Sequence, residues 1–140
     1  MAYPLDVSNS KMWSPNDGAG SEATVVEVFS AWLVEQGWEC EKLPPYGDHP
    51  DIDARHPDKG RLIVEAKGFT RDSSANLDIG YGQLLRRMRG EPATTYALVV
   101  AGTVVRFAQR VSPEVRSKLG ITLYTVDSNG KVDLVDGAPL

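Results

Sequence analysis

Apolar residues along the chain follow helical spacing in some segments and strand spacing in others, which predicts a mixed α/β protein. The first helix is expected to start at Glu22, with Ser21 as its cap and Gly37 as its end. At a rotation of about 100° per residue around the helix axis, the apolar side chains of this segment fall on one face. Glu22 falls near the middle of that apolar stripe, so its carboxylate is expected to point inward.

The rest of the pattern predicts strands and two more helices. Strands are expected at residues 38–42, 51–55, 61–67, 96–101, 121–126 and 131–135, and helices at residues 77–89 and between Pro113 and Gly120. The second and third strands are joined by a short turn and predict an antiparallel hairpin. A loop is expected at residues 71–74, and residues 104–108 are expected to extend the fourth strand or to form a separate one. Through residue 126 the order is α-β-β-β-α-β-α-β, which predicts a mixed central β-sheet flanked by helices.

The chain of 140 residues is expected to hold an N-terminal arm, residues 1–20, and a single domain, residues 21–140. The apolar residues of the arm follow neither helical nor strand spacing, and the arm is rich in Ser, Asn, Pro, Gly and Asp. Trp13 is expected to anchor it. No apolar run reaches the ~18 residues that a membrane span requires, and the start does not resemble a signal peptide. The single Cys40 excludes an intramolecular disulfide and a four-cysteine zinc site, so a reducing, cytoplasmic setting is expected.

The formal net charge of -4 conceals a basic middle region. Residues 1–54 carry two basic and ten acidic side chains, a balance of -8, whereas residues 55–118 carry twelve basic and six acidic ones, a balance of +6. The tail from residue 119 has a balance of -2. Net acidity therefore does not exclude a polyanionic partner, because an anion-binding face leaves this kind of asymmetry in a sequence.

The strand at residues 61–67 begins as an apolar run and ends with two charges, Glu65 and Lys67, on one face. Charges at the end of a core strand need partners or a metal ion, because burying an unpaired charge costs several kcal/mol. The preceding strand offers Asp51 and Asp53, which also share a face. The predicted hairpin brings this acidic pair beside Glu65.

Two carboxylates, the backbone carbonyl of Ala66 and water molecules would form a hard oxygen site suited to Mg²⁺ or Mn²⁺. A lysine on the same face can orient or deprotonate a water, or neutralise developing negative charge. Hydrolysis of a phosphodiester bond is the reaction that this set of groups serves best.

Pro50-Asp51, thirteen intervening residues and Glu65-Ala66-Lys67 resemble the signature of the PD-(D/E)XK nuclease superfamily. The stretch at residues 18–22 is similar to the start of archaeal-type Holliday junction resolvases. Residues 47–53 are similar to the site of methyl-directed restriction endonucleases, and in that alignment Asp53, rather than Asp51, is the metal ligand. The resemblance implies a restriction-endonuclease-like fold.

The resemblance also implies roles for individual residues in a Mg²⁺-dependent endonuclease acting on nucleic acid, with DNA favoured. Asp51, Glu65 and the Ala66 carbonyl would bind the metal, Lys67 would serve the attacking water, and Glu22 would complete the acidic site, through water. Contacts to nucleic acid would come from the helix at residues 77–89 and from the loop between the strand at residues 61–67 and this helix. The residues implied are Gln83, Arg86 and Arg87 of the helix and Arg71 of the loop.

Two other interpretations stay open. The chain could be a catalytically inactive module that keeps the nuclease fold to bind nucleic acid or a partner protein, or a plain α/β protein in which the acidic strand is incidental. Glu22 could serve only the helix dipole and Gln83 only the helix surface. His49 and His56 are expected to be structural, and Tyr81 to be core. The small size predicts a homodimer or a subunit of a larger complex.

Overall fold

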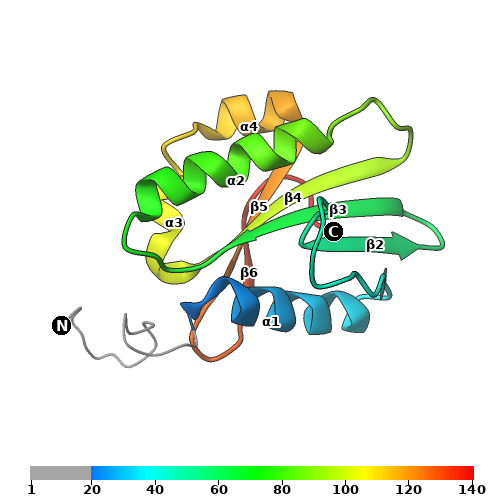
Figure 1. Cartoon of the computed structure of the whole chain (residues 1–140). Coiled ribbons are helices and arrows are strands. Elements are labelled where there is room, and N and C mark those ends of the chain that lie inside the picture. The colour runs from blue at the N-terminus through cyan, green and yellow to red at the C-terminus, as the bar shows by residue number, and fades with distance from the viewer. Residues whose placement is uncertain (1–19) are drawn as a thin grey trace.

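A six-stranded mixed β-sheet forms the centre of the computed structural model, which describes residues 20–140 (Figure 1). The strands are β1 (Glu39–Cys40), β2 (Ile52–His56), β3 (Gly60–Lys67), β4 (Thr94–Ala101), β5 (Ile121–Val126) and β6 (Val132–Asp136), and they lie in this order across the sheet. The expected arm and its anchor Trp13 lie outside the described residues, apart from Gly20.

The sheet combines antiparallel edges with a parallel centre. β2 pairs with β1 and β3 in antiparallel fashion, and β5 pairs with β6 in the same way. The inner pairs β3–β4 and β4–β5 are parallel. β4 is apolar and buried over its last five residues, as expected for a central strand covered on both faces. The mixed sheet predicted from the sequence is confirmed.

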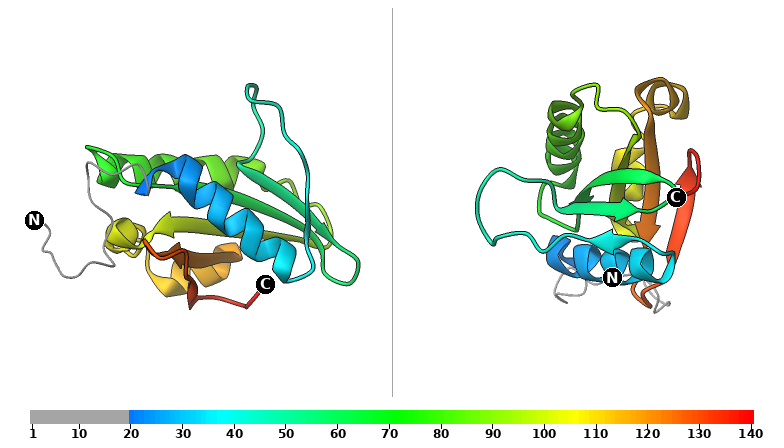
Figure 2. Two further views of the ribbon diagram at one scale, coloured as in Figure 1. Left: turned by 90° about the horizontal axis from the view of Figure 1, so that it is seen from below. Right: turned by 90° about the vertical axis from the view of Figure 1, so that its right-hand side faces the viewer.

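Helices cover both faces of the sheet. They are α1 (Glu22–Glu35), α2 (Ser73–Arg87), α3 (Val105–Ala108) and α4 (Pro113–Leu119), with a 3₁₀ turn η2 (Gly102–Val104) before α3. α1 lies against one face, while α2 and α4 lie against the other (Figures 1 and 2). Within residues 20–140, no helix is long and apolar enough to cross a membrane.

Serine side chains cap α1 and α4, the first of them as predicted. Ser21 caps α1 by accepting a hydrogen bond from the Thr24 N–H, and Ser112 caps α4 by accepting one from the Val115 N–H. α1 buries Val25, Phe29 and Leu33 against the sheet, which is the apolar stripe expected from helical spacing. Local sequence therefore specifies these two helices.

The start of α2 differs from the prediction. Residues 73 and 74 were expected in a loop, but they form the first turn of a helix that starts at Ser73. Asp72 caps this helix, because its Oδ1 accepts a hydrogen bond from the Ala75 N–H at 3.1 Å. The Ser73 hydroxyl donates to the Thr70 carbonyl and is buried. The polar run is a capping sequence rather than a loop.

Residues 104–108 are also different from the prediction: they form the end of η2 and all of α3, not a strand. The carbonyl of Ala108 accepts hydrogen bonds from the Tyr81 hydroxyl of α2 and from the fully buried guanidinium of Arg116 of α4. These contacts between distant segments hold the helical turn. The strand expected at residues 38–42 is reduced to the two residues of β1.

Candidate active site

The β2–β3 hairpin places Asp51 beside the end of β3. β2 begins at Ile52, which pairs with Val64, so Asp51 directly precedes the paired segment and lies next to Glu65. The Oδ2 atom of Asp51 accepts a hydrogen bond of 2.7 Å from the Ala66 N–H. The Asp51 carboxylate is thereby anchored where β2 and β3 separate.

The N-terminus of α1 is packed against the chain just after β3. A Cβ atom at Gly68 would come within 2.4 Å of the Glu22 N and of the Gly20 carbonyl oxygen, so only glycine fits there. The Phe69 N–H donates to the same Gly20 carbonyl at 2.8 Å. This close approach places Glu22, which belongs to a helix on one face of the sheet, near the end of β3.

Lys67 is buried, and its ammonium group contacts Glu22. The Nζ atom lies 3.3 Å from Glu22 Oε1. The aliphatic stem of Lys67 crosses α2 at Gly80, where an added Cβ would meet the Lys67 Cγ at 3.0 Å. Burial and the negative charge of Asp51 raise the pKa of Glu22, while Lys67 acts in the opposite direction. The sequence predicts an inward carboxylate at Glu22; in the structure its side chain is 44% exposed, and its carboxylate is directed at Lys67.

Glu65 is an acid in an almost fully buried position, with 2% of its surface exposed. Burial, followed by the negative charge of Asp51, raises the pKa of Glu65 to about 7, and Arg87 and Lys67 only partly oppose this. The Nε atom of Arg87 donates to Glu65 Oε2 at 3.2 Å. Burial and the neighbouring Asp51 carboxylate thus outweigh the attraction of Arg87 and Lys67 for the ionised form of Glu65.

This donor set fits a hard divalent cation. Asp51 and Glu65 supply carboxylate oxygens, and the Ala66 carbonyl points to the same side as its N–H, which bonds Asp51. Within the described part of the chain, no three His, Cys, Asp or Glu residues are grouped so that they could hold a metal. Water would therefore have to complete the coordination, as is usual for Mg²⁺.

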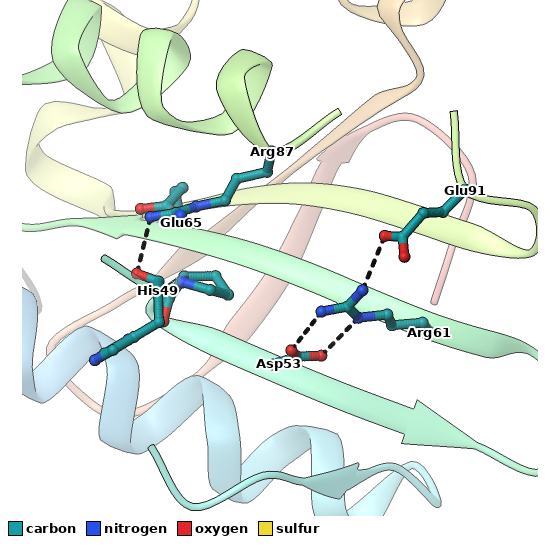
Figure 3. A network of polar contacts seen from close by, with 7 residues as sticks. His49, Asp53, Arg61, Glu65, Arg87 and Glu91 are labelled. Atoms are coloured by element: carbon teal, nitrogen blue, oxygen red, sulfur yellow. Dashed lines mark hydrogen bonds and ion pairs between the residues drawn. The ribbon is translucent and has the colours of Figure 1, made fainter. Parts of the chain in front are cut away.

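Asp53, the alternative metal ligand, is engaged elsewhere. Arg61 contacts it through two hydrogen bonds, Nε to Oδ1 at 3.0 Å and Nη2 to Oδ2 at 2.7 Å, and also reaches Glu91 at 2.9 Å (Figure 3). Asp53 raises the pKa of the Arg61 guanidinium above its ordinary value. Register explains this pairing, because Arg61 lies on the same face of the hairpin. Of the two aspartates, only Asp51 lies beside Glu65.

The residues expected to contact nucleic acid are spread along α2 and the residues just before it. Arg71 and Arg86 are exposed, but they lie at opposite ends of α2, which is about 22 Å long. Gln83 is half-buried, and its Oε1 is buried without a hydrogen-bond partner among the described residues.

Arg87 points inward rather than outward. Besides Glu65, its guanidinium contacts the His49 carbonyl at 2.8 Å (Figure 3). It also contacts Asp48 Oδ1 at 3.1 Å. It connects α2, β3 and the loop before β2. This role was not expected from the sequence, since the three segments are far apart in the chain and only helical spacing placed Arg87 near Gln83.

The two histidines and Tyr81 have structural surroundings, as expected. The ring nitrogens of His49 lie 2.8 Å from the carbonyls of Pro44 and Pro50, and these contacts tie the loop together. His56 packs against Trp38 and accepts the Asp58 N–H.

Comparisons with known proteins identify structural neighbours of this chain. No protein family model matches its sequence, and no curated protein matches it significantly. An XisH family protein from Nostoc punctiforme PCC 73102 aligns with a TM-score of 0.58 at 16% identity. An fdxN element excision controlling factor protein from Anabaena variabilis aligns with a TM-score of 0.50 at 19% identity. Each alignment covers 80% of this chain and 98% of the other. The chain thus shares the fold of these proteins, a mixed sheet flanked by helices that is consistent with a restriction-endonuclease-like fold.

Proposed function

We propose that this chain is a metal-dependent nuclease that hydrolyses phosphodiester bonds of nucleic acid, with DNA as the favoured substrate. The observation that carries the proposal is the pair of Asp51 and Glu65 at the end of β3. The burial of Glu65 and, after it, the negative charge of Asp51 raise the pKa of Glu65 to about 7, so a divalent cation would favour the ionised form.

Each residue has a distinct task in this proposal. Asp51, Glu65 and the Ala66 carbonyl would hold Mg²⁺ or Mn²⁺, and the bound ion would supply electrostatic stabilisation to the phosphate that is attacked. Lys67 would orient the attacking water, because its ammonium group is buried at the same strand end. Glu22 is a positioning residue that holds Lys67 Nζ at 3.3 Å.

A cleavage panel tests the proposal. The purified protein is incubated with Mg²⁺ or Mn²⁺ and with single-stranded, duplex and branched DNA, and with RNA. Asp51→Ala and Lys67→Ala should each lower the cleavage rate by about a hundredfold or more. Asp133→Ala and Lys131→Ala, which remove an exposed acid and an exposed base, serve as matched controls and should keep full activity. Cleavage that persists in both site variants would refute the assignment.

A second candidate function follows from the ion pairs of the site. Glu65 is paired with Arg87 and Lys67 with Glu22, so these two charges of the candidate site already have internal partners. This arrangement favours an inactive module that retains the nuclease fold and binds nucleic acid. Calorimetric titration with Mn²⁺ separates the two functions: salt-sensitive DNA affinity without metal binding would support the module.

A further inference from the structure

An arginine-rich pocket lies next to the candidate active site. Its volume is about 340 Å³, and its lining consists of Pro50, Arg61, Ile63, Arg86, Arg87, Arg89 and Glu91. We infer that this pocket binds a backbone phosphate of the nucleic-acid strand at a position removed from the bond that is cut. The inference rests on the proposed function, because it names how the substrate of the same site is held.

Four guanidinium groups line the pocket, and Arg61 and Arg87 are already paired with carboxylates. The positive charge that favours an anion therefore comes from Arg86 and Arg89, which have no such partners among residues 20–140. Two of the four, Arg61 and Arg87, are held in place by ion pairs and are largely covered, with 22% and 17% of their side chains exposed. Each uses three nitrogen donors in these contacts. A guanidinium has five N–H groups, so both retain donors for a phosphate oxygen.

The other two arginines of the lining are available to a ligand. Arg86 and Arg89 are exposed, and within residues 20–140 neither has a hydrogen bond or ion pair. Guanidinium groups bind phosphate through parallel N–H···O contacts, which makes arginine the preferred residue for such sites. The pocket therefore joins two fixed guanidinium groups to two free ones.

The spacing along β3 argues for a polymer rather than a single phosphate. Arg61, Ile63 and Glu65 occupy alternate positions of β3 and therefore lie on one face of it, so Arg61 and Ile63 of the pocket share that face with Glu65. Glu65 lies four positions after Arg61, which corresponds to about 13 Å along a strand. One phosphate cannot lie at both Arg61 and Glu65, whereas two phosphates of one strand with a further phosphate between them can.

Binding measured without metal tests the inference independently of cleavage. A fluorescent DNA of about a dozen nucleotides, single-stranded or duplex, is titrated in EDTA with wild type, Arg86→Ala/Arg89→Ala and the control Lys118→Ala/Lys131→Ala. The control removes the same charge from exposed positions outside the pocket. The arginine variant should bind about tenfold more weakly, and its salt dependence should fall by about 1–2 in log–log slope. The control should change affinity by less than about twofold.

Two results would overturn the inference. In the first, the arginine variant binds both DNA forms as tightly as wild type does, or the lysine control loses as much DNA affinity as the arginine variant. The other is inorganic phosphate that binds wild type as tightly as DNA does and loses affinity in the arginine variant, since the pocket would then be a free-anion site. The proposed function fails separately, through cleavage that is absent or that persists in Asp51→Ala. Arg86 and Arg89 are exposed, so thermal melting should show both variants folded.

Discussion

The guanidinium of Arg87 lies 3.2 Å from the carboxylate of Glu65 and joins the end of α2 to the buried centre of the candidate site. Through the same group, α2 also holds the loop before β2 at Asp48 and His49. Opposite charge from Arg87 lowers the pKa of Glu65, but burial and Asp51 have the larger effect and raise it. Folding therefore places Glu65 where its ionised form is electrostatically unfavourable.

The raised pKa of Glu65 predicts a pH dependence of stability. Its pKa rises from 4.5 in the unfolded chain to about 7 in the folded one, so the folded state binds the proton more tightly. The contribution of Glu65 to stability is thus most favourable below pH 4.5 and declines as pH rises through the window from 4.5 to 7. Glu65→Gln should remove this decline, which amounts to at most about 3 kcal/mol. Urea denaturation at several pH values measures it, and parallel curves for the two proteins would contradict the prediction.

Divalent metal should stabilise the folded chain, and more strongly at pH 8 than at pH 6. A metal ligand must be deprotonated, and Glu65 loses its proton near pH 7. At a Mg²⁺ concentration of about 100 times the Kd, stabilisation should reach about 2.7 kcal/mol. Thermal melting with and without Mg²⁺ measures the effect. Asp51→Ala should abolish it and the surface control Asp133→Ala should keep it; equal shifts in both variants would place the metal elsewhere.

Gly68→Ala should destabilise the protein and disturb the site. The added Cβ would collide with the backbone of Gly20, Ser21 and Glu22, which cannot give way as a side chain does. Overpacking of this kind costs about 1–3 kcal/mol. The displaced helix start should also separate Glu22 from Lys67 and reduce the cleavage rate. Gly82→Ala is the control, because its Cβ would meet no atom within 4 Å, and it should be neutral or stabilising.

Arg116→Ala should destabilise the fold without changing metal affinity. The Arg116 side chain is fully buried and bonds Asp136, the Tyr81 hydroxyl and the carbonyls of Ala108 and Val111. Removing one partner of a buried ion pair costs about 3–5 kcal/mol. Chemical denaturation measures the loss, with the exposed Arg106→Ala as reference, and Mn²⁺ calorimetry on the folded variant checks the affinity. A weakened metal affinity would show that this cluster also supports the site.

Much of the fold follows from short-range signals. Ser21 and Ser112 start their helices by satisfying backbone N–H groups that have no partner within the helix, and this can be recognised over three residues. The strand predicted at residues 104–108 was wrong because a short apolar run is equally compatible with a strand and with a buried helical turn. Contacts from Tyr81 and Arg116, distant in sequence, decide between the two.

The sequence alone determined the local geometry of the hairpin. Alternation along β2 and β3 places Asp51, Glu65 and Lys67 on one face, and helical spacing turns Glu22 inward, because both periodicities are fixed by the backbone. Only the tertiary structure decided which aspartate stays beside Glu65, since Asp53 is held by Arg61. It also decided that Arg87 turns toward Glu65, while Arg86 and Arg89 remain unpaired among residues 20–140. A charged side chain selects its partner by distance in space and by burial, and neither can be read from spacing along the chain.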